Sequence, residues 1–187
     1  MTREGILEAA ARIFSEKGFH ATSMQDIADA VHLQKASLYH HFSSKHEILV
    51  DILDQALDLI NTRLENVRSL YLTPDEKLRL AMVSYMQTIA ENQNLAAVLL
   101  LELRALDPEL KIRQASRREK FESLWKDLII EGKQQGIFND VDPSLTGRAI
   151  LGVMNWMVTW YRRDGPRSAK EIAEEFADLL LDGLLRN

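Results

Sequence analysis

The segment with the clearest structural signature runs from residue 22 to residue 46, TSMQDIADAVHLQKASLYHHFSSKH. Its apolar residues recur at the spacing of two short amphipathic helices. An amphipathic helix at residues 3–17, ending at Gly18, is expected to brace this pair as the third member of a small bundle. The apolar faces of the pair consist of Ile27, Ala28 and Val31 on the first helix and Leu38 and Phe42 on the second.

Local signals mark the ends of the first helix of this pair. Thr22 or Ser23 can cap it, with Gln25 or Asp26 three residues later as the partner in a capping box. The turn that follows is expected at residues 31–33. The chain is therefore predicted to reverse direction over a few residues and present a second short helix.

This second helix leaves a polar face uncovered. Residues 33–46 contain no acidic side chain, in a chain whose net charge is −5. Two short helices with the second presented outward form the helix-turn-helix pattern, in which the second helix enters the major groove of DNA. The side chains left off the core side are Gln34, Lys35, Ala36, Ser37, Tyr39, His40 and His41, followed by Ser44, Lys45 and His46.

A family resemblance follows from a set of positions in the first quarter of the chain. They are Gly18-Phe19, Thr22, Asp26-Ile27-Ala28, Lys35-Ala36-Ser37-Leu38-Tyr39, His41-Phe42 and Ser44-Lys45. With these residues the segment resembles the DNA-binding domain of TetR/AcrR-type transcriptional regulators. The resemblance implies a helix-turn-helix domain followed by a larger helical domain that dimerises and binds a small molecule. One departure is Ala36, where many relatives carry glycine.

The expected DNA contacts are of two kinds. Gln34, Ala36 and His40 are placed to meet base edges, since glutamine can pair with adenine and alanine can contact a thymine methyl group. By resemblance, His41 contacts a phosphate. The side chains expected to hold phosphates are Ser23, Lys35, Ser37, Tyr39 and Lys45.

The charge distribution favours a local DNA contact over general coating. Residues 1–46 carry five lysines and arginines against five acidic residues, so the whole net charge of −5 lies in residues 47–187. All five histidines also lie in the first segment. Such a chain should bind DNA through a small patch, doubled by dimerisation, and be repelled elsewhere.

Composition excludes several other classes. The chain has no cysteine, which rules out disulfides and thiolate zinc sites. Its start has no apolar signal region, and the longest apolar run, near residues 149–161, is shorter than the roughly 20 residues of a membrane span. We therefore expect a soluble cytoplasmic protein without a metal or cofactor. An enzyme is disfavoured because no phosphate-binding glycine loop or helical metal motif occurs.

The rest of the chain reads as helices. A long one begins at Ser44 and continues to about residue 72, and an apolar helix is expected at 95–106. No segment alternates like a strand, so the fold class is all-α. The predicted architecture is an N-terminal three-helix helix-turn-helix domain at 1–46 and a larger helical bundle at 47–187, for ligand binding and dimerisation. Further helices are expected at 73–91, 108–136, 143–163 and 169–185.

Two of these helices offer more apolar surface than a small bundle needs. Residues 149–161 are apolar almost all round, with Gly147 and Gly152 allowing a close approach, and residues 169–185 have a broad apolar face. A homodimer through residues 147–161 and 169–185, in a four-helix interface, is the expected consequence. The alternative is that both helices only complete the core of one chain.

The same region suggests an effector site. Aromatic and methionine side chains with a few polar groups are typical of a small-molecule cavity, although the same residues also occur as ordinary core aromatics. The stretch NWMVTWYRRDG resembles the subgroup that responds to acyl-coenzyme A thioesters, and a drug- or aromatic-metabolite sensor is the alternative. The candidate ligand-binding residues are Tyr85, Met86, Arg104, Asn155, Trp156, Trp160 and Arg162.

The predicted function is a ligand-controlled repressor that binds a palindromic double-stranded operator as a dimer. Effector binding would push the helix that begins at Ser44 and so move the two reading helices to a spacing that the operator cannot match. That it represses rather than activates is implied by the family resemblance alone. The remaining alternative is a helical protein-interaction module, which leaves the exposed Tyr39, His40 and His41 unexplained.

Overall fold

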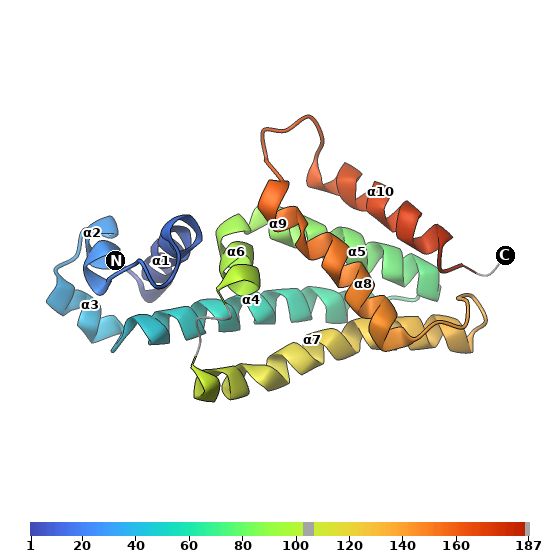
Figure 1. The fold of residues 1–187 in the computed structure, drawn as a ribbon, viewed down its shortest axis with the longest axis horizontal. Helices are drawn as coiled ribbons and strands as arrows, with labels where there is room; N and C mark the ends of the chain where they lie inside the picture. The colour runs from blue at the N-terminus through green and yellow to red at the C-terminus, as the bar shows by residue number, and fades with distance from the viewer. Residues whose placement is uncertain (103–106, 186–187) are drawn as a thin grey trace. The chain divides into compact units, whose positions relative to one another are not determined.

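The computed structural model describes residues 1–102 and 107–185, and over these residues it is helical without a named strand, as predicted (Figure 1). The helices are α1 (Arg3–Lys17), α2 (Met24–Ala30), α3 (Lys35–His41), α4 (Lys45–Arg68), α5 (Pro74–Glu91), α6 (Gln93–Leu101), α7 (Pro108–Gln134), α8 (Pro143–Asn155), α9 (Met157–Trp160) and α10 (Ala169–Asp182). The chain divides into two compact units, and the boundary between them falls within α4, after Asp58.

The first unit comprises Met1–Asp58 and Asn92–Ser116. It holds α1 to α3 and the first half of α4, and it also takes in α6, which packs against α1. The division of the chain into domains after residue 46 stays a prediction. The core side chains of this unit include Ile6, Phe14, Ile27, Leu38, Phe42, Ile48 and, from α6, Val98.

The first helix of the pair is capped by Ser23, which decides between the two predicted candidates. The Asp26 amide donates to the Ser23 hydroxyl oxygen at 3.1 Å, and the Ser23 amide donates to the Asp26 carboxylate at 2.8 Å. Thr22 is buried and donates instead to the Gly18 carbonyl at 2.8 Å. The turn before α3 places His32 at a φ of 54°, a left-handed conformation that is uncommon outside glycine.

The second unit comprises Leu59–Glu91 and Arg117–Asn187. In this unit α10 packs along α5, and α8 runs on into α9, which also contacts α5 (Figure 1). The Lys77 ammonium, nearly buried, pairs with Glu131 at 2.8 Å. The core includes Leu78, Met82, Met86, Trp125, Leu128, Met154 and Ala177.

Two predicted helices end earlier than expected. The helix expected to run to residue 163 stops at Asn155, and α9 follows as a separate turn. The amide and the hydroxyl of Thr159 both donate to the Trp156 carbonyl, at 3.1 and 2.7 Å, which gives a tighter turn than an α-helix. The last helix ends at Asp182 rather than 185, because the Leu184 carbonyl accepts from the Asn139 amide at 2.8 Å.

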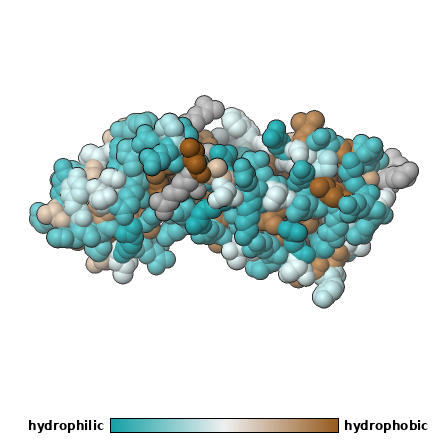
Figure 2. Space-filling view, turned by 90° about the horizontal axis from the view of Figure 1, so that it is seen from below, coloured by the Kyte–Doolittle hydropathy of each residue, from teal (hydrophilic) through white to brown (hydrophobic). Residues whose placement is uncertain are grey.

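The apolar helix expected at 95–106 spans Gln93–Leu101, and residues 103–106 lie outside the described part of the chain. The long helix α4 ends at Arg68, four residues short of the predicted end. Within residues 1–102 and 107–185, none of the helices has the length and apolar character needed to cross a membrane. Figure 2 shows a face that is mostly hydrophilic, with hydrophobic residues in small patches.

Candidate DNA-binding surface and effector region

Helix α3 is held by one buried side chain and exposes most of the others. Leu38 is fully buried, and Phe42 directly after the helix is buried too, so the opposite side of α3 faces solvent. The structure brings the predicted base-contacting residues together on that side. Gln34, Lys35, Ala36, Tyr39 and His40 are exposed, whereas Ser37 and His41 are half-buried.

Ser23 is exposed, but its hydroxyl group is part of the cap of α2. It donates to the Asp26 carboxylate and accepts from the Asp26 amide. These hydrogen bonds hold the pKa of Asp26 below its ordinary value, with the Ser23 hydroxyl as the largest cause. A phosphate contact by Ser23 stays a prediction, and it would have to share a hydroxyl that already stabilises the start of α2.

Lys45 has a structural environment that the sequence did not reveal. Its ammonium donates to the backbone carbonyl oxygens of Phe19, at 2.7 Å, and Thr22, at 2.5 Å, and lies 4.4 Å from the centre of the Phe19 ring. Desolvation lowers the pKa of Lys45. Lys45 therefore stabilises the corner between α1 and α2, and its predicted phosphate contact is untested.

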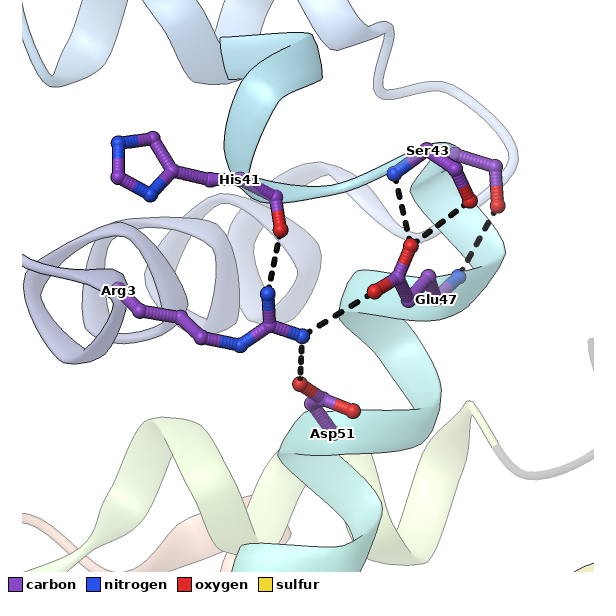
Figure 3. Close-up of polar contacts among 6 residues, drawn as sticks. Arg3, His41, Ser43, Glu47 and Asp51 are labelled. Atoms are coloured by element: carbon purple, nitrogen blue, oxygen red, sulfur yellow. Dashed lines mark hydrogen bonds and ion pairs between the residues drawn. The ribbon is translucent and has the colours of Figure 1, made fainter.

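Arg3 is the residue near this surface that sequence reasoning missed. Its guanidinium contacts Asp51 at 2.6 Å and Glu47 at 3.1 Å, and it also donates to the backbone carbonyl of His41 (Figure 3). The hydrogen bond to Asp51 is the main reason why the pKa of Arg3 is raised. One signal was available: Glu47 and Asp51 are four residues apart and therefore share a face of α4.

Two of the candidate effector residues, Tyr85 and Asn155, are in contact in the second unit, and a third is buried close to them in the sequence. The Tyr85 hydroxyl donates to the Asn155 side-chain oxygen at 2.7 Å, and Met86 on the same helix is fully buried. Burial raises the pKa of Tyr85, so its hydroxyl stays protonated and remains a donor. The Tyr85 ring also lies edge-on to Trp125, with ring centres 5.9 Å apart.

Trp125 adds a polar group that sequence reasoning did not include. Its side chain is buried, and its indole nitrogen finds no hydrogen-bond acceptor in the part of the chain that the structure describes. A buried donor without an acceptor is costly, and such groups often mark a place where water or a ligand binds. The position gave no signal in the sequence, because Trp125 reads as one of several apolar residues on a helix face.

Trp160 and Arg162 belong to a groove at the connection between α9 and α10. The groove has a volume of about 330 Å³ and an apolar wall that includes Phe176 and Ile172. The rings of Trp160 and Phe176 lie 6.4 Å apart. Arg167 also lines this groove, paired with Glu175, so the rim carries two cations and one anion.

The other candidate effector residues lie elsewhere. Trp156 is 67% exposed at the end of α8 and does not line this groove. Arg163, next to Arg162, donates to the carbonyl oxygens of Ala90 at 3.0 Å and Glu91 at 2.6 Å, and so caps the end of α5. Arg104 lies outside the described residues. No cluster of metal-binding side chains occurs within 1–102 and 107–185.

Two family models match the chain. Residues 71–184 match the model described as "Tetracyclin repressor-like, C-terminal domain", and residues 6–52 match "Bacterial regulatory proteins, tetR family". The chain belongs to the TetR family. This confirms the predicted resemblance and the prediction of a DNA-binding regulator rather than an enzyme. Regulators of this family bind operator DNA, act as dimers and bind small-molecule ligands.

Relatives match this regulator over almost its whole length. The HTH-type transcriptional repressor KstR2 of Mycobacterium tuberculosis is 29% identical over 186 residues, 98% of this chain and 93% of that protein. The structure of the regulator PfmR from Thermus thermophilus has a TM-score of 0.89 and 41% identity, covering 97% of this chain and 99% of that one.

A third relative, AibR, was solved in complex with isovaleryl coenzyme A and operator DNA. Its TM-score is 0.89 at 29% identity, covering 96% of this chain and 97% of AibR. Taken together, these relatives identify the chain as a ligand-responsive transcriptional repressor.

Proposed function

We propose that this repressor binds a palindromic operator as a homodimer and leaves it when an acyl-coenzyme A thioester binds the second unit. The observation that carries the choice of effector is the groove at the α9–α10 connection, which joins an apolar wall to a rim with two arginines. An elongated apolar molecule with an anionic end suits such a surface. The solved complex of AibR with isovaleryl coenzyme A supports the same class of ligand.

For the operator, we propose the contacts expected from the sequence. Gln34, Ala36 and His40 would read base edges from the exposed side of α3. In the dimer the two copies of α3 would stand about 34–36 Å apart, which is one turn of B-DNA. The phosphate contacts would come from Ser23, Lys35, Ser37, Tyr39, His41 and Lys45. Because its target is chromosomal DNA, we place the protein in the cytoplasm.

The proposed dimer interface uses α8 and α10. Along α8, Leu145, Val153 and Trp156 are exposed apolar residues at the spacing of one helix face, and on α10 Leu179 is 72% exposed. Large exposed apolar side chains of this kind are typical of surfaces that another protein covers. A second copy of the chain, packed by two-fold symmetry, would bury them in a four-helix interface.

The inner part of the effector site is proposed to lie beside Tyr85 and Asn155. The buried Tyr85 donates a hydrogen bond to the half-buried Asn155, and Trp125, whose ring lies against Tyr85, has an N–H group without an acceptor among the described residues. The carbonyl oxygen of a thioester is such an acceptor. Binding would then pull on the helices around it, including α4, whose first half belongs to the DNA-reading unit.

The test is a DNA-release titration with free coenzyme A, free fatty acids and acyl-coenzyme A thioesters of several chain lengths. We expect release by the thioesters only, with longer chains acting at lower concentration because each buried methylene adds about 0.8 kcal/mol. Binding should also quench the emission of Trp160. Indifference to all three compound classes, with release by an aromatic or cationic compound, would instead make this a drug- or metabolite-sensing repressor.

A matched pair of variants tests the groove itself. Arg162→Ala should weaken the response to acyl-coenzyme A and leave operator affinity in the absence of effector unchanged. Arg79→Ala is the control, because Arg79 is a partly exposed arginine of the second unit that pairs with Asp178 and does not line the groove. Equal responses of the two variants would remove Arg162 from the proposed site.

A further inference from the structure

Arg3 joins three parts of the first unit that are far apart in the sequence. It comes from the first turn of α1, and its guanidinium reaches the last residue of α3 and the first two turns of α4 (Figure 3). The α3 contact is the backbone carbonyl of His41, and the α4 contacts are the carboxylates of Glu47 at 3.1 Å and Asp51 at 2.6 Å. We call these four residues the Arg3 clamp.

The short connection between α3 and α4 is fixed from the same point. The second carboxylate oxygen of Glu47 accepts from the amide and the hydroxyl of Ser43, both at 2.7 Å. The Arg3 guanidinium also lies 3.9 Å from the centre of the Phe42 ring. Residues 41–43, which set the angle between α3 and α4, are therefore all held by Arg3 or by its partner Glu47.

Only an arginine can make this set of contacts. Its planar guanidinium offers five N–H donors in a fixed arrangement, whereas a lysine ammonium is a compact charge that cannot span the same three acceptors. The side chain is 45% exposed, so its ion pairs are screened and should contribute little to the free energy of folding. The main consequence of the clamp is therefore geometrical.

His41 shows what this geometry controls. Its carbonyl group points toward the Arg3 guanidinium, while its ring points away from it (Figure 3). His41 is half-buried and follows directly after His40, which is exposed on α3. We propose that Arg3 is a positioning residue for operator recognition, which fixes α3 on α4 and thereby the placement of the His41 side chain. This inference rests on the proposed DNA-reading role of α3.

The first test compares Arg3→Lys and Arg3→Ala with Arg12→Ala. Arg12 is a matched control on the same helix, because it is exposed and its side chain makes one ion pair among the described residues, with Glu16 at 3.8 Å. The probe is a duplex that the unmodified protein selects from random-sequence DNA. Because each dimer carries two clamps, a roughly threefold loss for each half-site becomes about tenfold for the palindrome. We expect this loss for both Arg3 variants and a change of less than about twofold for Arg12→Ala.

The second test uses the sign of a charge effect. If the clamp residues influenced DNA only through charge, Asp51→Asn would remove a negative charge and tighten binding. The proposal expects weaker binding instead, and no further loss when Asp51→Asn is combined with Arg3→Ala. In the same way, His41→Ala, which keeps the carbonyl group, should weaken binding in the unmodified protein and have little effect in Arg3→Ala.

Two control measurements distinguish a positioning role of Arg3 from a general loss of folding. Thermal unfolding and acyl-coenzyme A binding are measured on each variant, and operator affinity is measured where every variant is fully folded. Arg3→Lys binding like the unmodified protein, tighter binding by Asp51→Asn, or additive effects of the Arg3 and His41 changes would each overturn the proposal. If the unmodified protein selected no duplex, the proposed DNA reading by α3 would fail first.

Discussion

Helices α3 and α8 expose opposite kinds of side chain. The open face of α3 carries Gln34, Lys35 and His40, whereas the open face of α8 carries Leu145 and Trp156. The first surface suits a hydrated polyanion, and binding to it should depend strongly on salt. The second suits a protein surface that excludes water. Under the proposed function, a single chain builds the DNA-reading surface of α3, whereas the apolar surface of α8 requires a second chain to cover it.

The largest expected effect follows from a charge on the apolar surface. Leu179→Glu should turn a micromolar dimer into a monomer, because an unpaired carboxylate would be desolvated in the interface. Operator affinity should then fall by about two orders of magnitude or more, since two half-sites are no longer read together. Sedimentation velocity and gel retardation measure the two effects.

The choice of position matters for this test. Leu181 is only 2% exposed in the single chain, so a charge there would disrupt the core of the second unit before it tested assembly. Glu174→Ala on the exposed side of α10 is the control and should leave the dimer intact. A monomeric unmodified protein at micromolar concentration would disprove the proposed interface.

An effect of intermediate size is expected from two tyrosine variants, one in the second unit and one on α3. Tyr85→Phe should lower the free energy of unfolding by about 1 kcal/mol, because it removes the hydrogen bond from the buried Tyr85 to the half-buried Asn155. Tyr39→Phe, on the exposed face of α3, should leave thermal unfolding unchanged and weaken operator binding. Calorimetry and gel retardation on both variants should therefore give opposite patterns, and equal unfolding temperatures would contradict the structural role of Tyr85.

A smaller effect is expected from one cation on the reading surface. Lys35→Ala should weaken binding to all DNA sequences similarly, and it should reduce the salt dependence by about one ion per subunit. The affinity is measured as a function of salt concentration. Arg79→Ala in the second unit should change neither quantity. An unchanged salt slope for Lys35→Ala would show that Lys35 does not contact a phosphate.

The smallest effect concerns acid stability. Hydrogen bonds from Ser43, first from its hydroxyl, hold the pKa of Glu47 below its ordinary value of 4.5. A carboxylate whose folded pKa is lowered stabilises the protein fully above its unfolded pKa, and that stability is lost as the pH falls through the folded value. Between about pH 5 and pH 3, the free energy of unfolding should therefore fall less steeply with falling pH for Glu47→Gln than for the unmodified protein. An equal dependence of the free energy of unfolding on pH in the two proteins would contradict the prediction.

The sequence was sufficient to predict those features that depend on residues close to each other along the chain. The capping box of Ser23 and Asp26 spans three residues, and the burial of Leu38 and Phe42 follows from a four-residue spacing. The exposed residues of α3 follow from the same periodicity. Such features are readable because the interacting groups are one helical turn apart, whatever the rest of the chain does.

Tertiary structure alone decided the contacts between distant residues. Arg3 meets Asp51 across 48 residues, and the Lys45 ammonium points to the Phe19 carbonyl 26 residues earlier. Periodicity also could not tell that Trp156 lies on the open side of α8 while Trp125 is enclosed, its N–H group unpaired among the described residues. A side chain's spacing shows which face of its helix it occupies. What that face meets depends on how the other helices pack, and a local pattern does not contain that information.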